Sequence, residues 1–249
     1  GPRLRDATGH GLELVPVGGV SWTRDEVTGG AMSFDGTGHL RIAAADAGAL
    51  DAASAGDRVS VMALVRRDST TTGFIAGMWQ EHDDDPRRQY GLFTSLPTYG
   101  GDQQVCGHVS ADGRPSDELP YSRDYAASER VVPIGSWHVV GFTYDGESIV
   151  AWLDGIADKR PRYTEPEYPL GAGLTYAKNP YRYAGGLNRL TKSDFTVGGV
   201  MLTSGMGNMF VGRIARLAVF AEALDERAVV RLQRSWIRWS SGRLLGAPR

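Results

Sequence analysis

The sequence predicts an all-β protein with one helix near its C-terminal end, and three observations support this. Short apolar or alternating runs recur along the chain, separated by many of its 33 glycines and 12 prolines. That pattern is typical of antiparallel sandwiches and barrels. The stretch SWHVVGFTYDGESIVAWLDG (136–155) contains two such runs joined at Asp145-Gly146, a dipeptide that favours tight hairpin turns. One segment, near the C-terminus, has helical apolar spacing instead.

The predicted strands follow from these runs. In chain order they span residues 12–15, 30–34, 38–42, 58–66, 73–79, 88–95, 104–110, 136–144, 147–153, 194–200 and 210–220. In the run 58–66, alternate residues are expected to share one face of the strand. These residues are Val59, Val61, Ala63 and Val65.

The helix is predicted over residues 223–239. Asp225 is a suitable N-cap, because its carboxylate can accept a hydrogen bond from a free amide of the first turn. Val229, Leu232 and Trp236 then follow at helical spacing and predict one apolar face.

Residues 155–193 lack regular periodicity. A loop of this length inside a compact domain is usually functional or disordered, and its tyrosines argue against disorder. They are Tyr163, Tyr168, Tyr176, Tyr181 and Tyr183. No linker or internal repeat is visible, so we predict a single domain over residues 1–249. Gly1-Pro2 is interpreted as the remnant of a cleaved tag.

Composition and charge narrow the class of protein. The chain has 249 residues, 41% of them hydrophobic and 22% charged, which is ordinary for a globular domain with a sizeable core. The net charge is −2 and both signs are interspersed, so nucleic acid is not an expected partner. No apolar run approaches the ~20 residues that span a bilayer. Cys106 is the single cysteine and cannot form an internal disulfide.

Four segments, in the expected order, carry a resemblance to a known family. They are AMSFDGTGHLRI (31–42), GSWHVVGFTYDGESIVAWLDG (135–155), DFTVGGV (194–200) and FVGRIARLAVFAEALDERAVVRL (210–232). Together they resemble the laminin-G-like branch of the concanavalin A-like lectin/glucanase superfamily. The resemblance implies two antiparallel sheets packed as a jelly-roll sandwich, one of them forming a concave groove. Members bind glycans or proteins, or cleave polysaccharides, and the fold alone does not choose among these functions.

The resemblance also implies a structural calcium ion. Asp35, in the run Asp35-Gly36-Thr37-Gly38, lies where relatives often place a calcium ligand. The remaining ligands would include backbone carbonyls, which a sequence does not reveal. One cysteine and five scattered histidines give no zinc spacing. We expect a secreted or periplasmic location, with any signal peptide absent from the sequence.

The middle third of the chain is rich in groups that suit a glycan. Aromatic faces stack on the C–H surfaces of sugars, while Gln, Arg and His fix hydroxyl or acidic groups. The candidate substrate-binding residues are Trp79, Gln80, Arg88, Tyr90, Gln104, Tyr125, Tyr176, Tyr181 and Tyr183. Some of them also have a structural interpretation: the tyrosines of the long loop could pack on one another, and Arg88 could pair with Asp83-Asp84-Asp85.

Two catalytic mechanisms are known on this fold. The Glu-x-Asp-x-x-Glu motif of retaining hydrolases on this fold is absent, which disfavours glycoside hydrolysis. β-Elimination of a uronate polysaccharide needs a cation for the carboxylate, a base and an acid. Arg88 and Arg123 are candidates for the first role, His108 for the base and Tyr121 for the acid.

Three functional hypotheses stay open at this point. The first is a protein that binds a polysaccharide in a concave groove and cleaves it as a lyase. The second is a carbohydrate-binding module without catalysis. The third is a glycoside hydrolase or a protein-interaction domain. The sequence specifies neither the sugar nor the oligomeric state.

Overall fold

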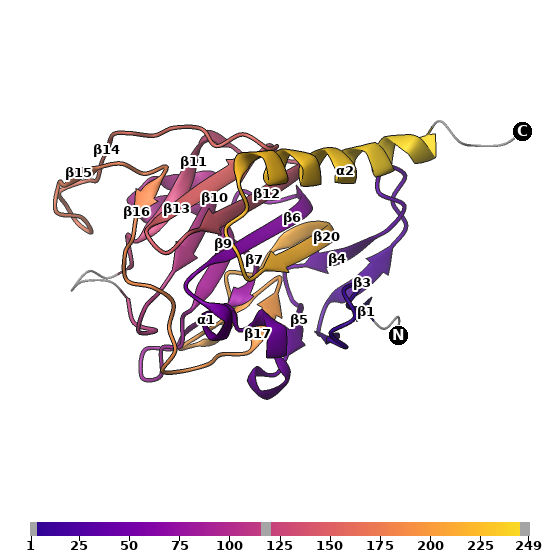
Figure 1. The fold of residues 1–249 in the computed structure, drawn as a ribbon, viewed down its shortest axis with the longest axis horizontal. Coiled ribbons are helices and arrows are strands. Elements are labelled where there is room, and N and C mark those ends of the chain that lie inside the picture. Colours follow the sequence, from indigo (N-terminus) through magenta and orange to yellow (C-terminus); the bar gives the residue numbers. More distant parts are fainter. Residues whose placement is uncertain (1–3, 116–120, 245–249) are drawn as a thin grey trace, which may run out of the picture.

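The computed structural model describes residues 4–115 and 121–244 as two large antiparallel sheets (Figure 1). Within these residues one sheet has eight strands, in the order β1 (Leu4–Arg5), β2 (Glu13–Val17), β5 (His39–Ile42), β17 (Phe195–Val197), β7 (Gly73–Met78), β9 (Tyr90–Leu96), β10 (Gly101–Val109) and β11 (Tyr125–Val131). The other has seven, in the order β16 (Tyr181–Arg182), β13 (Ser148–Leu153), β12 (Trp137–Tyr144), β6 (Val59–Arg67), β20 (Val211–Phe220), β4 (Ala31–Asp35) and β3 (Val20–Thr23). The predicted all-β sandwich of jelly-roll type is confirmed.

Smaller elements connect the strands. Two minor sheets pair β14 (Tyr163–Thr164) with β15 (Thr175–Tyr176), and β19 (Gly205–Gly207) with β18 (Val200–Leu202) and β8 (Gln80–Glu81). Short helical turns occur at η1 (Ala44–Asp46), η2 (Gly48–Leu50), α1 (Ala52–Ala55) and η3 (Pro97–Tyr99). Gly1-Pro2, interpreted above as a tag remnant, lies outside the described residues.

The main core lies between the two large sheets. On β6 the predicted alternation is confirmed, because Val59, Val61, Ala63 and Val65 all belong to this core. Met62 and Leu64, between them in sequence, point to the opposite face of the same sheet and form a second cluster with Val229. Both faces of the seven-stranded sheet are therefore apolar, and the apolar side chains on its outer face must be shielded from water by another element.

Helix α2 (Glu226–Leu244) supplies that cover and lies across the seven-stranded sheet (Figure 1). Val229 is fully buried, and Leu232 and Trp236 pack against the same cluster, as their spacing predicted. None of the described helices is long and apolar enough to cross a membrane. The outer face of the eight-stranded sheet is not covered by this helix.

Asp225 is the N-cap of α2, with Oδ1 accepting a hydrogen bond from the Ala228 amide at 2.7 Å. Replacing it, Asp225→Ala, is expected to lower the free energy of unfolding by about 1 kcal/mol, since that amide loses its acceptor. Asp225→Asn keeps a carbonyl acceptor and should cost clearly less. Urea unfolding followed by circular dichroism measures both, and equal losses would contradict the capping role.

Residues 155–193, the tyrosine-rich segment, follow an irregular but tightly bonded path. Asn179 pairs with the Ala151 backbone of β13 through both its amide atoms, at 2.9 and 3.0 Å. Lys178 is fully buried, and its carbonyl accepts a hydrogen bond from Ala127 of β11. The segment thus joins the adjacent edges of the two sheets.

Lys178 Nζ lies 3.3 Å from the ring centroid of Tyr125 and donates to the Arg123 carbonyl at 3.1 Å. Three further rings, of Tyr163, Tyr176 and Tyr181, lie 5.5 to 5.8 Å from the same ammonium. Burial lowers the pKa of Lys178 well below its ordinary value. This lysine and its four tyrosines form the tyrosine cage.

Two features of the sheets differ from the predictions. The run predicted as one strand over 194–200 is divided into β17 and β18, because Gly198, with φ +85°, turns the chain. Strands β1, β3, β11 and β16 of the large sheets were not predicted, nor were the short strands β8, β14, β15 and β19. The sequence of β11, YAASERV, has few of the β-branched and aromatic residues that identify strands.

Candidate functional site

A cavity of about 510 Å³ opens on the outer face of the eight-stranded sheet. Strand alternation sends one set of side chains there and the next set into the core. On β9, Leu92 packs in the core while Phe93 lines the cavity; on β10, Val109 and His108 divide in the same way. Cavities of this size are typical of small-molecule sites.

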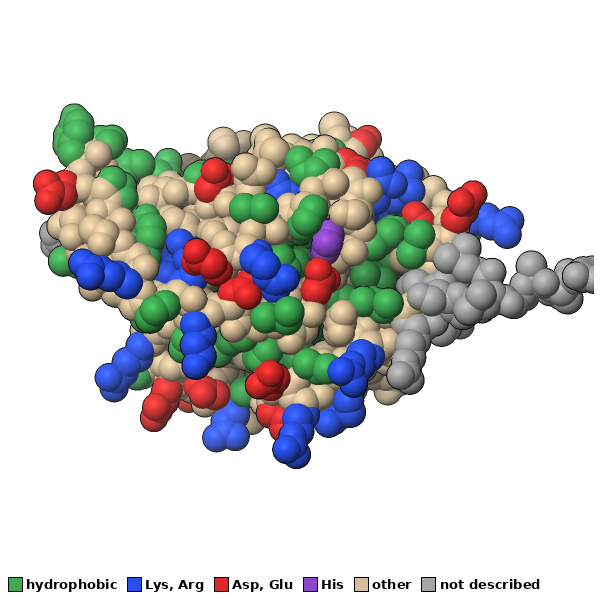
Figure 2. Space-filling view, turned by 90° about the horizontal axis from the view of Figure 1, so that it is seen from above, with side chains coloured by type: hydrophobic (Ala, Val, Ile, Leu, Met, Phe, Trp, Pro, Cys, Tyr) green, Lys and Arg blue, Asp and Glu red, His purple; other side chains and the backbone are tan. Residues whose placement is uncertain are grey.

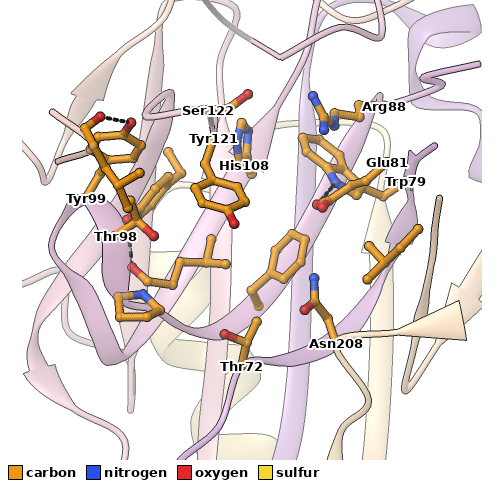
Figure 3. Close-up of a pocket in the computed structure, with 16 residues that line it drawn as sticks. Thr72, Trp79, Glu81, Arg88, Thr98, Tyr99, His108, Tyr121, Ser122 and Asn208 are labelled. Atoms are coloured by element: carbon orange, nitrogen blue, oxygen red, sulfur yellow. Dashed lines mark hydrogen bonds between the residues drawn. The ribbon is translucent and has the colours of Figure 1, made fainter. Parts of the chain in front are cut away.

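Aromatic rings form the floor of the cavity. The ring of His108 lies 4.5 Å from that of Trp79 and 5.8 Å from that of Tyr125, measured between centroids. Phe93 meets Trp79 edge-on at 6.0 Å. Tyr121 is 59% exposed and projects across the middle of the cavity (Figure 3). One accessible ring thus faces a floor of buried ones.

Two charged residues line one end of the cavity (Figure 3). The Glu81 carboxylate accepts a hydrogen bond from the Trp79 indole at 2.7 Å. Arg88 is only 9% exposed, and its Cζ lies 5.7 Å from the centroid of the Trp79 ring. Its Nε and Nη1 atoms are buried without a hydrogen-bond partner among the described residues. Burial lowers the pKa of this guanidinium from its ordinary value.

His108 is a buried and neutral imidazole. Its Nδ1 lies 3.1 Å from the Val109 carbonyl, which can only accept, so Nδ1 carries the proton and Nε2 is free to accept. Burial, and next the charge of Arg88, lower the pKa of His108 to about 3. A group with so low a pKa is a weak general base near neutral pH.

The structure brings together five of the predicted site residues: Trp79, Arg88, His108, Tyr121 and Tyr125 all line the cavity. Tyr125 is 2% exposed, and its hydroxyl donates to the Leu96 carbonyl at 2.8 Å. The roles assigned to these residues stay predictions.

Three predicted residues point elsewhere. Tyr90 lies on the face of β9 opposite to Phe93. It is fully buried in the main core, and its hydroxyl donates to the Leu50 carbonyl. Gln80 donates its amide to the Asp85 carbonyl. Gln104 lies at a register shift of β10, where its amide donates to the Glu129 carbonyl and accepts from Arg160. None of them lines the cavity.

Arg123 and two of the predicted tyrosines belong to the structural network beside the cavity. Arg123 pairs with the buried Glu165 at 3.0 Å, and the Tyr176 hydroxyl donates to the same carboxylate at 3.3 Å. The Tyr181 hydroxyl donates to Asp124 at 2.6 Å. Because these groups bond to one another around the tyrosine cage, they do not reach the cavity.

A second cavity, of about 280 Å³, adjoins the first, since His108 and Ser122 line both. Tyr183 lines this one, and its hydroxyl accepts a hydrogen bond from the Ala111 amide at 2.9 Å. Asp112 and Arg114 add charges of both signs. The predicted Tyr183 therefore lies near the main cavity without lining it.

The sequence reasoning missed several lining residues. Glu81 and Phe93 lie close in sequence to the predicted residues Trp79 and Tyr90, and alternation along the predicted strand 88–95 was the signal for Phe93. Leu202 and Asn208 come from the distant β18–β19 region, and no local pattern marks them.

Asp35 was the expected calcium ligand. Its side chain is exposed, and Oδ1 accepts hydrogen bonds from the amide and the hydroxyl of Thr37, at 2.8 and 2.7 Å. Among residues 4–115 and 121–244, no group of three or more His, Cys, Asp or Glu side chains could hold a metal. A site built partly from backbone carbonyls would not contain such a group, so the calcium assignment of Asp35 stays a prediction.

On the face drawn in Figure 2, the charged side chains form no patch of one sign that would indicate a second binding site. There the Lys and Arg side chains are interspersed with Asp and Glu, and hydrophobic side chains lie between them. This mixture agrees with the net charge of −2.

The two large sheets form a β-sandwich, and several known structures have a similar fold. No family model and no curated protein matches the chain. Domain 4 of AbnA, an extracellular GH43 arabinanase from Geobacillus stearothermophilus solved with arabinotriose, is similar with a TM-score of 0.54 and 16% identity over 92% of each chain.

Two further structures are similar. The CBM40 of the Ruminococcus gnavus IT-sialidase, bound to α2,3-sialyllactose, has a TM-score of 0.53 and 9% identity over 86% of this chain and 98% of that one. The binding domain of botulinum neurotoxin DC, in complex with SialylT, has a TM-score of 0.56 and 10% identity over 93% of this chain and 48% of that one. At such identities the likeness shows the fold.

Proposed function

We propose that the chain binds an oligosaccharide in the cavity on the outer face of the eight-stranded sheet. The observation that carries this proposal is the combination, in one open cavity, of an exposed tyrosine, an aromatic floor and a few convergent polar groups. Support also comes from the similar sandwiches of the arabinanase and the sialidase, which were solved with sugars bound.

The lining accounts for both parts of sugar recognition. A sugar ring presents C–H faces that pack on aromatic rings, and Tyr121 and Trp79 offer such rings. Its hydroxyls need donors and acceptors: Glu81 accepts, Arg88 donates, and His108 Nε2 accepts. The adjoining second cavity extends the site, so a chain of more than one sugar unit fits the proposal.

Tyr121→Ala is expected to weaken glycan binding about 10-fold, because it removes the exposed stacking surface while leaving the buried floor in place. A glycan array identifies the ligand, and isothermal titration calorimetry gives the affinities. Tyr168→Ala is the matched control, since Tyr168 is 87% exposed and does not line the cavity. An array on which no glycan binds, or equal losses in the two variants, would contradict the proposal.

Binding rather than cleavage is the function proposed. The β-elimination hypothesis needs His108 as a base, and the low pKa of its imidazole opposes that role. It also assigned a carboxylate to Arg123, which is paired with Glu165 outside the cavity. A uronate polymer that gained near-ultraviolet absorbance on incubation with the protein would restore the lyase hypothesis.

A further inference from the structure

We infer that the cavity selects an acidic sugar, whose carboxylate pairs with Arg88. This inference rests on the proposed function and names its ligand class. It starts from the charge that Arg88 brings into the cavity and from the lack of a partner for that charge within the described residues.

The position of Arg88 is fixed by its backbone. Its amide donates to the Gly113 carbonyl at 3.3 Å, and its carbonyl accepts from the Asn188 side chain at 3.0 Å. The side chain then packs beside the Trp79 ring at the end of the cavity. The guanidinium is therefore held in the cavity by the fold.

The charge of Arg88 has no ion-pair partner. No carboxylate of the described residues lies within the 4.0 Å of an ion pair, although Glu81, Asp83 and Asp112 act on the guanidinium from farther away. Two other partly buried arginines are ion-paired: Arg213 with Asp25 at 3.1 Å, and Arg160 with Glu129 at 2.9 Å. A desolvated charge without a partner is costly, so a carboxylate brought into the cavity by a ligand would stabilise Arg88.

Arg67 shows what a structural arginine looks like in this protein. It is 1% exposed and does not line the cavity; its Nη2 also lacks a partner among the described residues, but Nε donates to the Ser69 carbonyl and Nη1 to the Gln103 carbonyl. Arg88 has neither bond. Because Nε and Nη1 of Arg88 are buried, Nη2 is the nitrogen through which it can reach a ligand.

A sugar carboxylate suits this end of the cavity. It would accept from Nη2 in a charge-assisted hydrogen bond, while the sugar ring packs on Trp79 and Tyr121. Glu81 lies at the same end and repels an anion, which weakens but does not cancel the pairing. Removing that charge by Glu81→Gln keeps an acceptor for the Trp79 indole, and should therefore tighten binding of the acidic sugar.

The test compares an acidic glycan with its neutral methyl ester: sialyllactose with its methyl ester, which differ by one carboxylate charge, and trigalacturonate with its trimethyl ester, which differ by three. The protein is expected to bind the acidic member of at least one pair about 10-fold to 100-fold more tightly. Arg88→Gln should bring that ratio close to one. Glu81→Gln should raise it about fivefold.

Arg87→Gln is the matched control, because Arg87 is the adjacent residue, pairs with Asp85 and does not line the cavity. Its ratio should equal that of the unchanged protein. Circular dichroism shows whether Arg88→Gln folds. If it does not, the affinity ratio of Glu81→Gln still tests the inference. Equal affinity for both members of every pair overturns the inference and leaves glycan binding intact. Absence of all glycan binding overturns the proposed function itself.

Discussion

Lowering the pH from 6.5 to 4 is expected to destabilise the folded protein by about 3 kcal/mol through His108 alone. Burial lowers the pKa of this imidazole from 6.5 to about 3 in the folded state. In that interval the unfolded chain takes up the proton and the folded chain does not, so acid favours unfolding. Stability should be regained as the pH rises past 6.5.

Urea unfolding between pH 4 and 7 measures this slope. His108→Phe keeps a ring of similar position and removes the titrating group, so most of the slope should vanish even though the variant is less stable overall. A slope will remain, because burial also lowers the pKa of His39, and the hydrogen bond from Arg189 lowers the pKa of Asp57, whose protonation near pH 4 likewise favours unfolding. An undiminished slope in His108→Phe would show that His108 is not buried as described.

Trp79→Ala is expected to lower the free energy of unfolding by about 3–5 kcal/mol and to abolish glycan binding. Trp79 is 2% exposed and packs on Phe93, His108 and Arg88, so its loss leaves a large void under the cavity. It also removes the indole donor that holds Glu81.

The matched control is Trp22→Ala, because Trp22 is 53% exposed on the edge strand β3. It should cost far less stability and leave binding unchanged. Trp79→Phe, which keeps an aromatic ring, should fall between the two in stability. Thermal unfolding and calorimetry with the array-identified glycan give both quantities. Retained affinity in a folded Trp79→Ala variant would mean that the sugar binds elsewhere.

Much of the fold could be predicted because most of its strands have a local sequence pattern that identifies them. The alternation from Val59 to Val65 specifies a face without knowledge of the partner sheet, and Asp225 specifies where α2 begins. Strand β11 could not be found in this way. Its alanines and Ser128 are buried because neighbouring elements cover them, and that cover is a tertiary property.

The site was predictable in composition but only partly in placement. Trp79, Arg88 and His108 were found because their side chains suit a sugar. Tyr90 suited one equally well, yet strand alternation directs it into the core. Arg123 was predicted to bind a carboxylate of the substrate. In the structure it pairs with Glu165, which lies 42 residues away, and no local pattern connects the two.

The tyrosine cage has a consequence for the thermodynamics of binding. Tyr125 is immobilised by Lys178 on its face and by the Leu96 carbonyl at its hydroxyl, and it also forms a wall of the cavity. When a ligand contacts this wall, the Tyr125 side chain loses almost no conformational entropy, because folding has already ordered it. Tyr121, which is exposed, still has that freedom to lose. The entropic penalty of occupying the cavity is therefore concentrated at its rim.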